Sequence, residues 1–153
     1  MPRLLLVHGG HPGGRIARLV AAIQQTVLAE VPEVTLVVRP ALAAGIADLL
    51  DAQALLCATP EHFGYMSGAL KDFFDRTYYP AEGKTQGLPY SLLVSAGTDG
   101  TGTCRAVERI ARGYGWVEVA APVIVVGEPD AAGVGRATEL AVTLAAGLAV
   151  GIY

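Results

Sequence analysis

The sequence predicts one α/β domain over residues 1–153, in which a five-stranded parallel β-sheet carries helices on both faces. Three observations favour this fold class. Short apolar runs alternate with helix-like segments along the chain, as in parallel sheets with right-handed crossovers. Hydrophobic residues make up 52% and charged residues 16%, which fits a sheet buried on both faces. Glycine-rich loops follow the first, third and fourth strand-like runs.

The first part of the chain predicts three strands and two helices. An apolar strand over 4–8 is followed by a helix over 16–27, whose apolar residues recur at helical spacing and form one stripe. The β-branched run 35–38 predicts a second strand, and 45–51 predicts a short, weak helix. The apolar run 54–58 predicts a buried third strand.

A helix is predicted to end near Thr77, because its apolar residues recur at helical spacing. Its polar side is expected to carry two ion pairs one turn apart. These pairs are Lys71 with Asp75 and Asp72 with Arg76.

The remaining segments predict two further strands and two helices. Proline and glycine make 78–89 a surface connection. Residues 90–95 predict the fourth strand, and a helix over 103–114 follows it. The fifth strand is expected over 117–126 with a break at Pro122, and the terminal helix begins near residue 131.

Composition excludes several functional classes. A net charge of -3 without a basic stripe argues against nucleic acid as the main partner. The uncharged segment 140–153 is shorter than the roughly 20 apolar residues of a membrane span, so we expect a buried helix and no span. The N-terminal run 3–7, an arginine followed by four apolar residues, is too short for a signal-peptide core, so a cytoplasmic location is expected. The apolar composition also indicates an oligomer interface, and a homodimer is the expected assembly.

The two cysteines, Cys57 and Cys104, form neither a disulfide framework nor metal-ligand spacing. We expect both to be buried and inert. The sequence predicts no metal site and no catalytic side chain.

The segment from Thr59 to Thr77 is the most specific motif in the chain. It resembles the flavin-ring loop of flavodoxin-like proteins, in the branch of NAD(P)H-dependent FMN and quinone reductases. The positions that carry the resemblance are Thr59-Pro60, Gly64-Tyr65-Met66-Ser67-Gly68, Lys71, Phe73 and Asp75-Arg76. The resemblance implies a flavodoxin-like three-layer sandwich with strand order 2-1-3-4-5, in which FMN lies beyond the carboxyl ends of strands one and three.

The second glycine-rich loop, over 59–66, follows the third predicted strand. The resemblance places its backbone groups of 60–66 at the polar edge of the flavin ring, with Phe63 or Tyr65 near the face of the ring. His62 is interpreted as solvent-exposed, with a proton-donor role as the alternative. The candidate FMN-binding residues here are Thr59, Pro60, Glu61, His62, Phe63, Gly64, Tyr65 and Met66.

The first loop lies at the N-terminus of the first helix, where glycine backbone and the helix dipole favour an anion. The resemblance places the FMN phosphate here. The family's hydroxyl residues are absent, and His11 and Arg15 are expected to bind the phosphate in their place. The alternative is a tight turn with weakened FMN affinity. The candidates are Gly9, Gly10, His11, Pro12, Gly13, Gly14, Arg15 and Ile16.

The third loop follows the fourth strand and resembles the family's second ring-contacting loop. Its hydroxyl and amide groups are expected at the carbonyl and imide edge of the ring. The alternative is an ordinary turn in which Thr101 or Thr103 caps the next helix, and both roles are compatible. The candidates are Ser95, Ala96, Gly97, Thr98, Asp99 and Gly100.

Three functions are consistent with these residues. The first is an FMN-dependent oxidoreductase that uses NAD(P)H to reduce a quinone, a flavin or a similar acceptor. The second is a flavodoxin-type electron carrier, which the weak net charge of -3 disfavours. The third is a flavodoxin-fold binding protein that has lost tight FMN binding, which the hydroxyl-free first loop favours.

Overall fold

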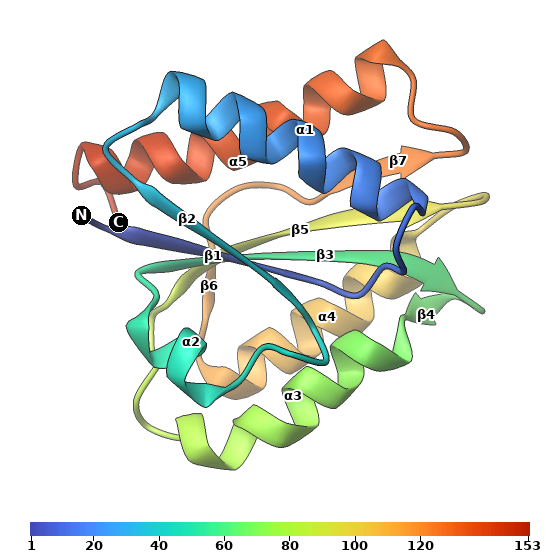
Figure 1. Ribbon diagram of the computed structural model, residues 1–153. Coiled ribbons are helices and arrows are strands. Elements are labelled where there is room, and N and C mark those ends of the chain that lie inside the picture. Colours follow the sequence, from blue (N-terminus) through green and yellow to red (C-terminus); the bar gives the residue numbers. More distant parts are fainter.

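A computed structural model describes residues 1–153 as a three-layer α/β sandwich (Figure 1). Four parallel strands form most of the sheet. They are β1 (Arg3–His8), β2 (Thr35–Pro40), β3 (Ala54–His62) and β5 (Pro89–Ala96). The order β2-β1-β3-β5-β6 confirms the predicted order 2-1-3-4-5, because β5 is the fourth predicted strand and β6 begins the fifth.

The strand count differs from the prediction, because the sheet has seven strands and not five. The predicted fifth strand is divided into β6 (Val117–Glu118) and β7 (Val123–Val126), both parallel to β5. Pro122 lies in the gap and has no amide to donate. Within the gap, the hydroxyl of Ser91 donates to the carbonyl oxygen of Ala120 at 2.9 Å. The seventh strand, β4 (Tyr65–Met66), pairs with the end of β3.

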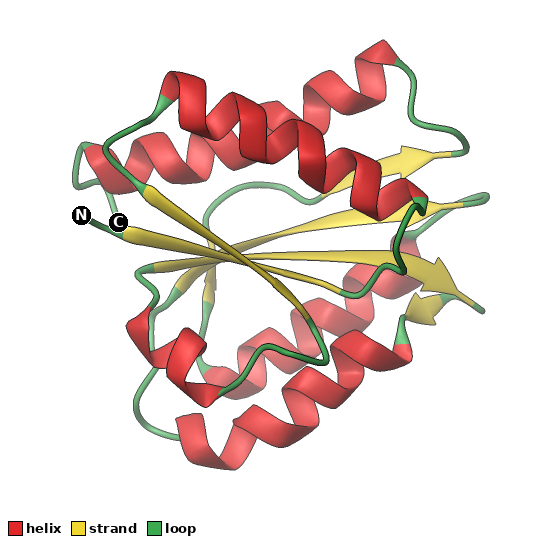
Figure 2. Cartoon of the chain, in the orientation of Figure 1, coloured by secondary structure: helices red, strands yellow, loops and turns green.

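Helices cover both faces of the sheet (Figure 2). Helices α1 (Arg15–Glu30) and α5 (Ala131–Ala149) lie on one face, and α2 (Ile46–Asp51), α3 (Gly68–Ala81) and α4 (Thr101–Tyr114) lie on the other. Successive residues of a strand point to opposite faces. Accordingly, Leu4 and Leu6 belong to the core beneath α1 and α5, whereas Leu5 and Val7 belong to the core beneath the other three helices.

Helix α3 runs to Ala81, so the prediction of a surface connection from residue 78 was wrong at its start. Pro80 lies inside the last turn, where its missing amide costs one intrahelical bond. Packing supports this turn, since the ring of Tyr78 meets that of Tyr114 edge-on at a centroid distance of 5.2 Å. The hydroxyl oxygens of Thr77 and Tyr114 also lie 2.8 Å apart.

The terminal helix is buried, as predicted for its uncharged sequence. Leu140, Leu144 and Leu148 of α5 are buried in the core beneath α1 and α5. The chain then turns back, and the ring of Tyr153 packs so closely on Gly147 that any side chain there would overlap it. No helix of the protein has the length and apolar character needed to cross a membrane.

Candidate functional site

The three glycine-rich loops meet at the carboxyl edge of the sheet, where they line one cavity of about 340 Å³. Parallel strands all end on this edge, which is why loops far apart in sequence converge there. Ten of the predicted residues line the cavity: Gly10, His11, Gly14, Arg15, Ile16, Pro60, Glu61, His62, Ser95 and Gly97. Arg18 and Glu128 also line it and were not predicted.

The first loop closes tightly between β1 and α1. The amide of Gly9 donates to the Ala58 carbonyl at 2.8 Å, and the amide of Gly14 donates to the His11 carbonyl at 3.1 Å. A side chain at Gly10 would lie 2.8 Å from Cβ of Ile16, so the glycine allows the loop to rest on the helix. Ile16 itself is a core residue, 1% exposed, so any ligand role would fall to its backbone.

Helix α1 begins without a side-chain cap. Its N-cap is Gly14, and no acidic residue lies in the first turn. The first amides of a helix have no intrahelical acceptor and carry partial positive charge. This end of α1 therefore offers donors and a favourable dipole to an anion, as the sequence predicted for the first loop.

Arg15 and Arg18 bring positive charge to the same place, but both are already paired with Glu128. Arg15 Nε lies 3.2 Å from Glu128 Oε1, and Arg18 Nη2 lies 2.9 Å from Glu128 Oε2. The hydrogen bond from Arg18, followed by that from Arg15, lowers the pKa of Glu128. Arg18 could have been found from its position one turn after Arg15 on α1. Glu128 could have been found from its place just after the last predicted strand.

The second loop differs from the prediction, because β3 continues through Thr59 to His62 and forms a hairpin with β4. Glu61 pairs with Met66, and His62 pairs with Tyr65. Phe63 and Gly64 make the two-residue turn, with φ of 54° and 73°. Positive φ at both turn residues suits the twist of a hairpin, and glycine adopts it without strain. The Phe63 side chain is fully exposed at the tip, whereas Met66 is buried in the core.

The hairpin is attached to the first turn of α4. Thr103 Oγ1 donates to Glu61 Oε2 at 3.1 Å, and a side chain at Gly102 would lie 2.6 Å from the Gly64 carbonyl oxygen. The alternative interpretation of the third loop, in which Thr101 or Thr103 caps this helix, was wrong. The helix begins at Thr101, and its N-cap is Gly100 in a left-handed conformation with φ of 83°.

The remaining predicted residues do not line the 340 Å³ cavity. Thr59 is buried, and its hydroxyl accepts from the Ser67 amide at 3.0 Å and donates to the Pro60 carbonyl at 2.8 Å. The carbonyl of Ala96 accepts from the Gly127 amide. Ten predicted residues do not line the 340 Å³ cavity or the second cavity described next: Gly13, Thr59, Phe63, Gly64, Tyr65, Met66, Ala96, Thr98, Asp99 and Gly100.

A second cavity of about 430 Å³ lies on the other side of the first loop and includes Gly9 and Pro12. All three histidines of the chain line it, and two of them, His11 and His62, also line the first cavity. His8 Nδ1 is buried without a hydrogen-bond partner. Burial lowers the pKa of His8, so its imidazole is neutral at neutral pH.

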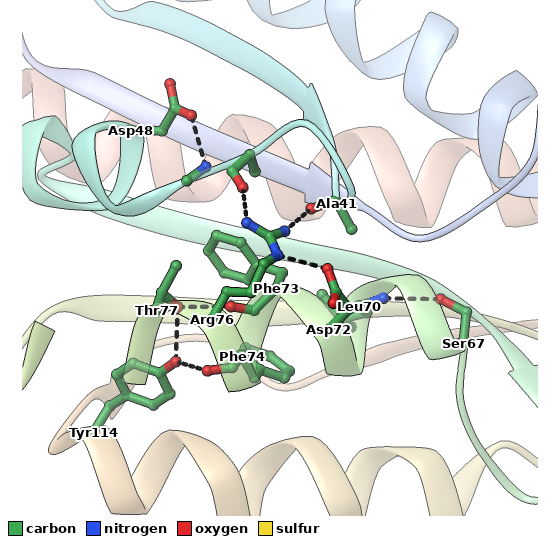
Figure 3. Close-up of polar contacts among 12 residues, drawn as sticks. Ala41, Asp48, Ser67, Leu70, Asp72, Phe73, Phe74, Arg76, Thr77 and Tyr114 are labelled. Carbon is green, nitrogen blue, oxygen red and sulfur yellow. Dashed lines mark hydrogen bonds and ion pairs between the residues drawn. The ribbon is translucent and has the colours of Figure 1, made fainter. Parts of the chain in front are cut away.

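Arg76 of α3 contacts the backbone after β2, a segment that forms part of the wall of the second cavity. Figure 3 shows these contacts. The guanidinium of Arg76 donates to the carbonyl oxygens of Ala41 at 2.8 Å and Ala44 at 2.9 Å, and to the carboxylate of Asp72 at 2.6 Å. Ala41 lines the cavity. The predicted pair with Asp72 is confirmed, and the two carbonyl bonds are an addition that periodicity did not indicate. The other predicted pair, between Lys71 and Asp75, is present at 2.7 Å.

Both cysteines are buried and unpaired with each other, as expected. Burial raises the pKa of Cys57 to about 12 and that of Cys104 to about 11, so both remain thiols at neutral pH. A thiol is a poor nucleophile compared with a thiolate. No group of three or more histidine, cysteine or acidic side chains is placed to hold a metal ion.

A protein-family model described as NADPH-dependent FMN reductase matches residues 14–130. No curated protein matches the chain in sequence. Among solved structures, a flavodoxin from Archaea is similar with a TM-score of 0.77 and 16% identity, covering 94% of this chain and 96% of that one.

Two further solved structures are similar. A WrbA-like flavodoxin from Agrobacterium tumefaciens has a TM-score of 0.75 and 19% identity, over 95% of this chain and 96% of its own. The apo form of the NADH:FMN oxidoreductase EmoB has a TM-score of 0.75 and 14% identity, over 95% of this chain and 88% of its own. At these identities the likeness establishes the flavodoxin-like fold.

Proposed function

This chain belongs to the NADPH-dependent FMN reductase family, and we propose that it uses FMN to carry electrons from NAD(P)H to a quinone, a free flavin or a similar acceptor. As a family member it is a flavin-dependent oxidoreductase with FMN as its cofactor. The donor and the acceptor are the proposed part, and the family name is what supports NADPH as donor.

One observation carries the proposal. The single cavity of about 340 Å³ is lined by all three loops that the resemblance assigns to FMN, although these loops lie up to 87 residues apart, from Gly10 to Gly97. Its volume is in the range of small-molecule sites, and its polar groups converge from several elements. The uncapped end of α1, with Arg15 and Arg18 beside it, suits the phosphate of FMN.

The residues have separate tasks in this proposal. Arg15, Arg18 and the first amides of α1 would hold the phosphate, while Pro60, Ser95 and Gly97 would border the ring. FMN supplies the two-electron chemistry when it is bound. The protein supplies position, and the exposed side chains of His11 and His62 line both cavities.

Two alternatives are separated from this proposal by experiment. An electron carrier of the flavodoxin type would hold FMN but would not be reduced by NAD(P)H. A binding protein that has lost tight FMN binding would take up no flavin. The first loop supports the second alternative, because it contains no hydroxyl residue between His8 and Ala17.

The test begins with the visible absorption spectrum of the purified protein, before and after addition of FMN and removal of the excess. We expect a retained flavin spectrum that NADPH or NADH bleaches under anaerobic conditions and that a quinone restores. Retained flavin without bleaching would reject the reductase in favour of the carrier. If no flavin is retained, turnover of NAD(P)H with added FMN must be measured, and its absence would leave the binding protein.

A cytoplasmic homodimer completes the proposal. The free cysteines fit a reducing compartment. The fully exposed Phe63 at the hairpin tip is an apolar side chain that a second copy could cover. Light scattering with and without Phe63→Ser tests the dimer, and a monomeric wild type would reject it.

A further inference from the structure

We propose that Glu128 is an internal anion that competes with the phosphate of FMN for Arg15 and Arg18, and that this competition keeps the flavin exchangeable. The inference rests on the proposed function and adds to it a residue that sets affinity. It predicts that the protein favours FMN over its dephosphorylated form, riboflavin, less strongly than a variant without the Glu128 carboxylate does.

The geometry of Glu128 is that of a phosphate substitute. Each of its two carboxylate oxygens contacts a different arginine, at 3.2 Å from Arg15 Nε and 2.9 Å from Arg18 Nη2. All three side chains line the 340 Å³ cavity. A phosphate at the start of α1 would seek the same N–H groups, because arginine binds carboxylate and phosphate through the same planar donors.

The loop between β7 and α5 places the carboxylate there. Gly127 adopts a left-handed conformation with φ of 74°, and its amide donates to the Ala96 carbonyl at 2.8 Å. Two residues after Glu128, the carboxylate of Asp130 accepts from the Gly133 amide at 2.8 Å and caps α5. The backbone on either side of Glu128 is thus fixed, which places its side chain within reach of α1.

The charges around the cavity balance when Glu128 is included. The charged lining residues are Arg15, Arg18, Glu61 and Glu128, two of each sign. Glu61 accepts from Thr103, away from the arginines. Glu128 is therefore the carboxylate that pairs with both arginines, and its single negative charge offsets one of their two positive charges.

The Glu128 side chain is exposed to solvent, which allows a phosphate to replace it at the arginines. The Glu128 side chain is 67% exposed, so it can leave the arginines and enter water when a phosphate arrives. Binding of FMN replaces the two ion pairs with Glu128 by two ion pairs with the phosphate. The arginines therefore contribute less to FMN binding than unpaired arginines would. Riboflavin has no phosphate and does not enter this competition.

The test is Glu128→Gln, which keeps the size of the side chain and removes its charge. Dissociation constants for FMN and riboflavin are measured by flavin fluorescence quenching at low salt. We expect FMN to bind about 3- to 10-fold more tightly than in the wild type, with riboflavin unchanged, because the freed arginines form charge-assisted bonds to the phosphate. Salt at about 0.5 M should remove most of the gain, because it screens exposed charges.

Glu139→Gln is the matched control, since Glu139 is an exposed glutamate on α5 that lines neither cavity. It changes the net charge by the same amount and should leave FMN affinity unchanged. The double variant Arg18→Ala/Glu128→Gln should lose most of the gain, since one of the two freed cations is removed.

Weaker or unchanged FMN binding in Glu128→Gln would overturn the proposal. That result is expected if the carboxylate only positions the arginines for the phosphate. Equal tightening of riboflavin would also overturn it. If no variant binds any flavin, the proposed function fails, and inorganic phosphate becomes the probe, followed by ³¹P line broadening. In that case the competition stands only if Glu128→Gln binds phosphate more tightly than the wild type, and equal binding rejects it.

Discussion

Thr103 of α4 donates its hydroxyl to the carboxylate of Glu61 at 3.1 Å, and this bond joins a helix to the hairpin that follows β3. Next to it, Gly102 allows the Gly64 carbonyl to approach the helix. Two residues of one helical turn therefore set where the hairpin lies relative to the cavity. The second loop is therefore connected to the helix that follows the third loop.

Gly102→Ala should displace the hairpin and weaken FMN binding. The new Cβ would lie 2.6 Å from the Gly64 carbonyl oxygen, which is backbone and cannot rotate away. We expect a loss of about 1–3 kcal/mol in the free energy of unfolding, as for overpacked sites. Urea denaturation and FMN titration are the measurements. Gly113→Ala in the same helix is the control, because its Cβ has room and should stabilise by about 0.5–1 kcal/mol.

Arg15→Ala should weaken FMN binding by about 10-fold and leave riboflavin binding nearly unchanged, because the removed group would contact only the phosphate. Parallel titrations with the two flavins measure the difference. Arg105→Ala removes an exposed arginine on α4 that forms no ion pair, and it should affect neither ligand. Equal losses for FMN and riboflavin in Arg15→Ala would reject the phosphate role.

Arg76→Met should destabilise the protein by about 1–3 kcal/mol, because the carbonyl oxygens of Ala41 and Ala44 lose a charged donor. The wall of the second cavity should loosen, and amide hydrogen exchange of residues 41–45 should rise. Lys71→Met is the comparison, since it breaks only the exposed pair with Asp75 and should cost less than about 1 kcal/mol. Similar costs for both variants would contradict the bracing role of Arg76.

Stability should rise with pH through the range just below 6.5 because of His8. Burial lowers the pKa of His8 in the folded protein below its ordinary value of 6.5, so the unfolded chain binds more protons in that range. The free energy of unfolding therefore increases as pH rises from the folded pKa to the unfolded one. Urea denaturation as a function of pH measures the slope.

His8→Gln should flatten that slope, because the variant has no imidazole to titrate at this position. At about pH 8, where imidazole is neutral in both states, the variant and the wild type should show the same pH dependence. An unchanged slope below 6.5 in His8→Gln would assign the effect to other groups.

The fold was predictable from the sequence in most of its elements. The alternation of strands and helices, the buried faces of α1 and α3 and the two ion pairs of α3 all follow from periodicity. The errors lie where local pattern and packing disagree. Glycine and aromatic residues in 59–66 suggested a loop, but strand pairing extends β3 to His62. Pro80 suggested an end to α3, but the packing of Tyr78 on Tyr114 extends the helix.

The location of the candidate site was predictable from the sequence, but the ion pairs of its arginines were not. Three glycine-rich loops had to meet, because parallel strands end at one edge of the sheet. The sequence also placed His11 and Arg15 in the first loop. Nothing local indicated that Glu128, 110 residues after Arg18, would pair with both Arg15 and Arg18.

The sequence by itself determined which segments are strands and helices, which of their faces are buried and which loops carry the glycines of the site. These properties depend on the periodicity and the backbone preferences of short stretches of sequence. Only the tertiary structure decided that Glu128 contacts Arg15 and Arg18, that Thr103 binds Glu61 and that Arg76 reaches Ala41 and Ala44. Such contacts depend on strand order and on how helices lie across the sheet, and no short stretch of sequence contains that information.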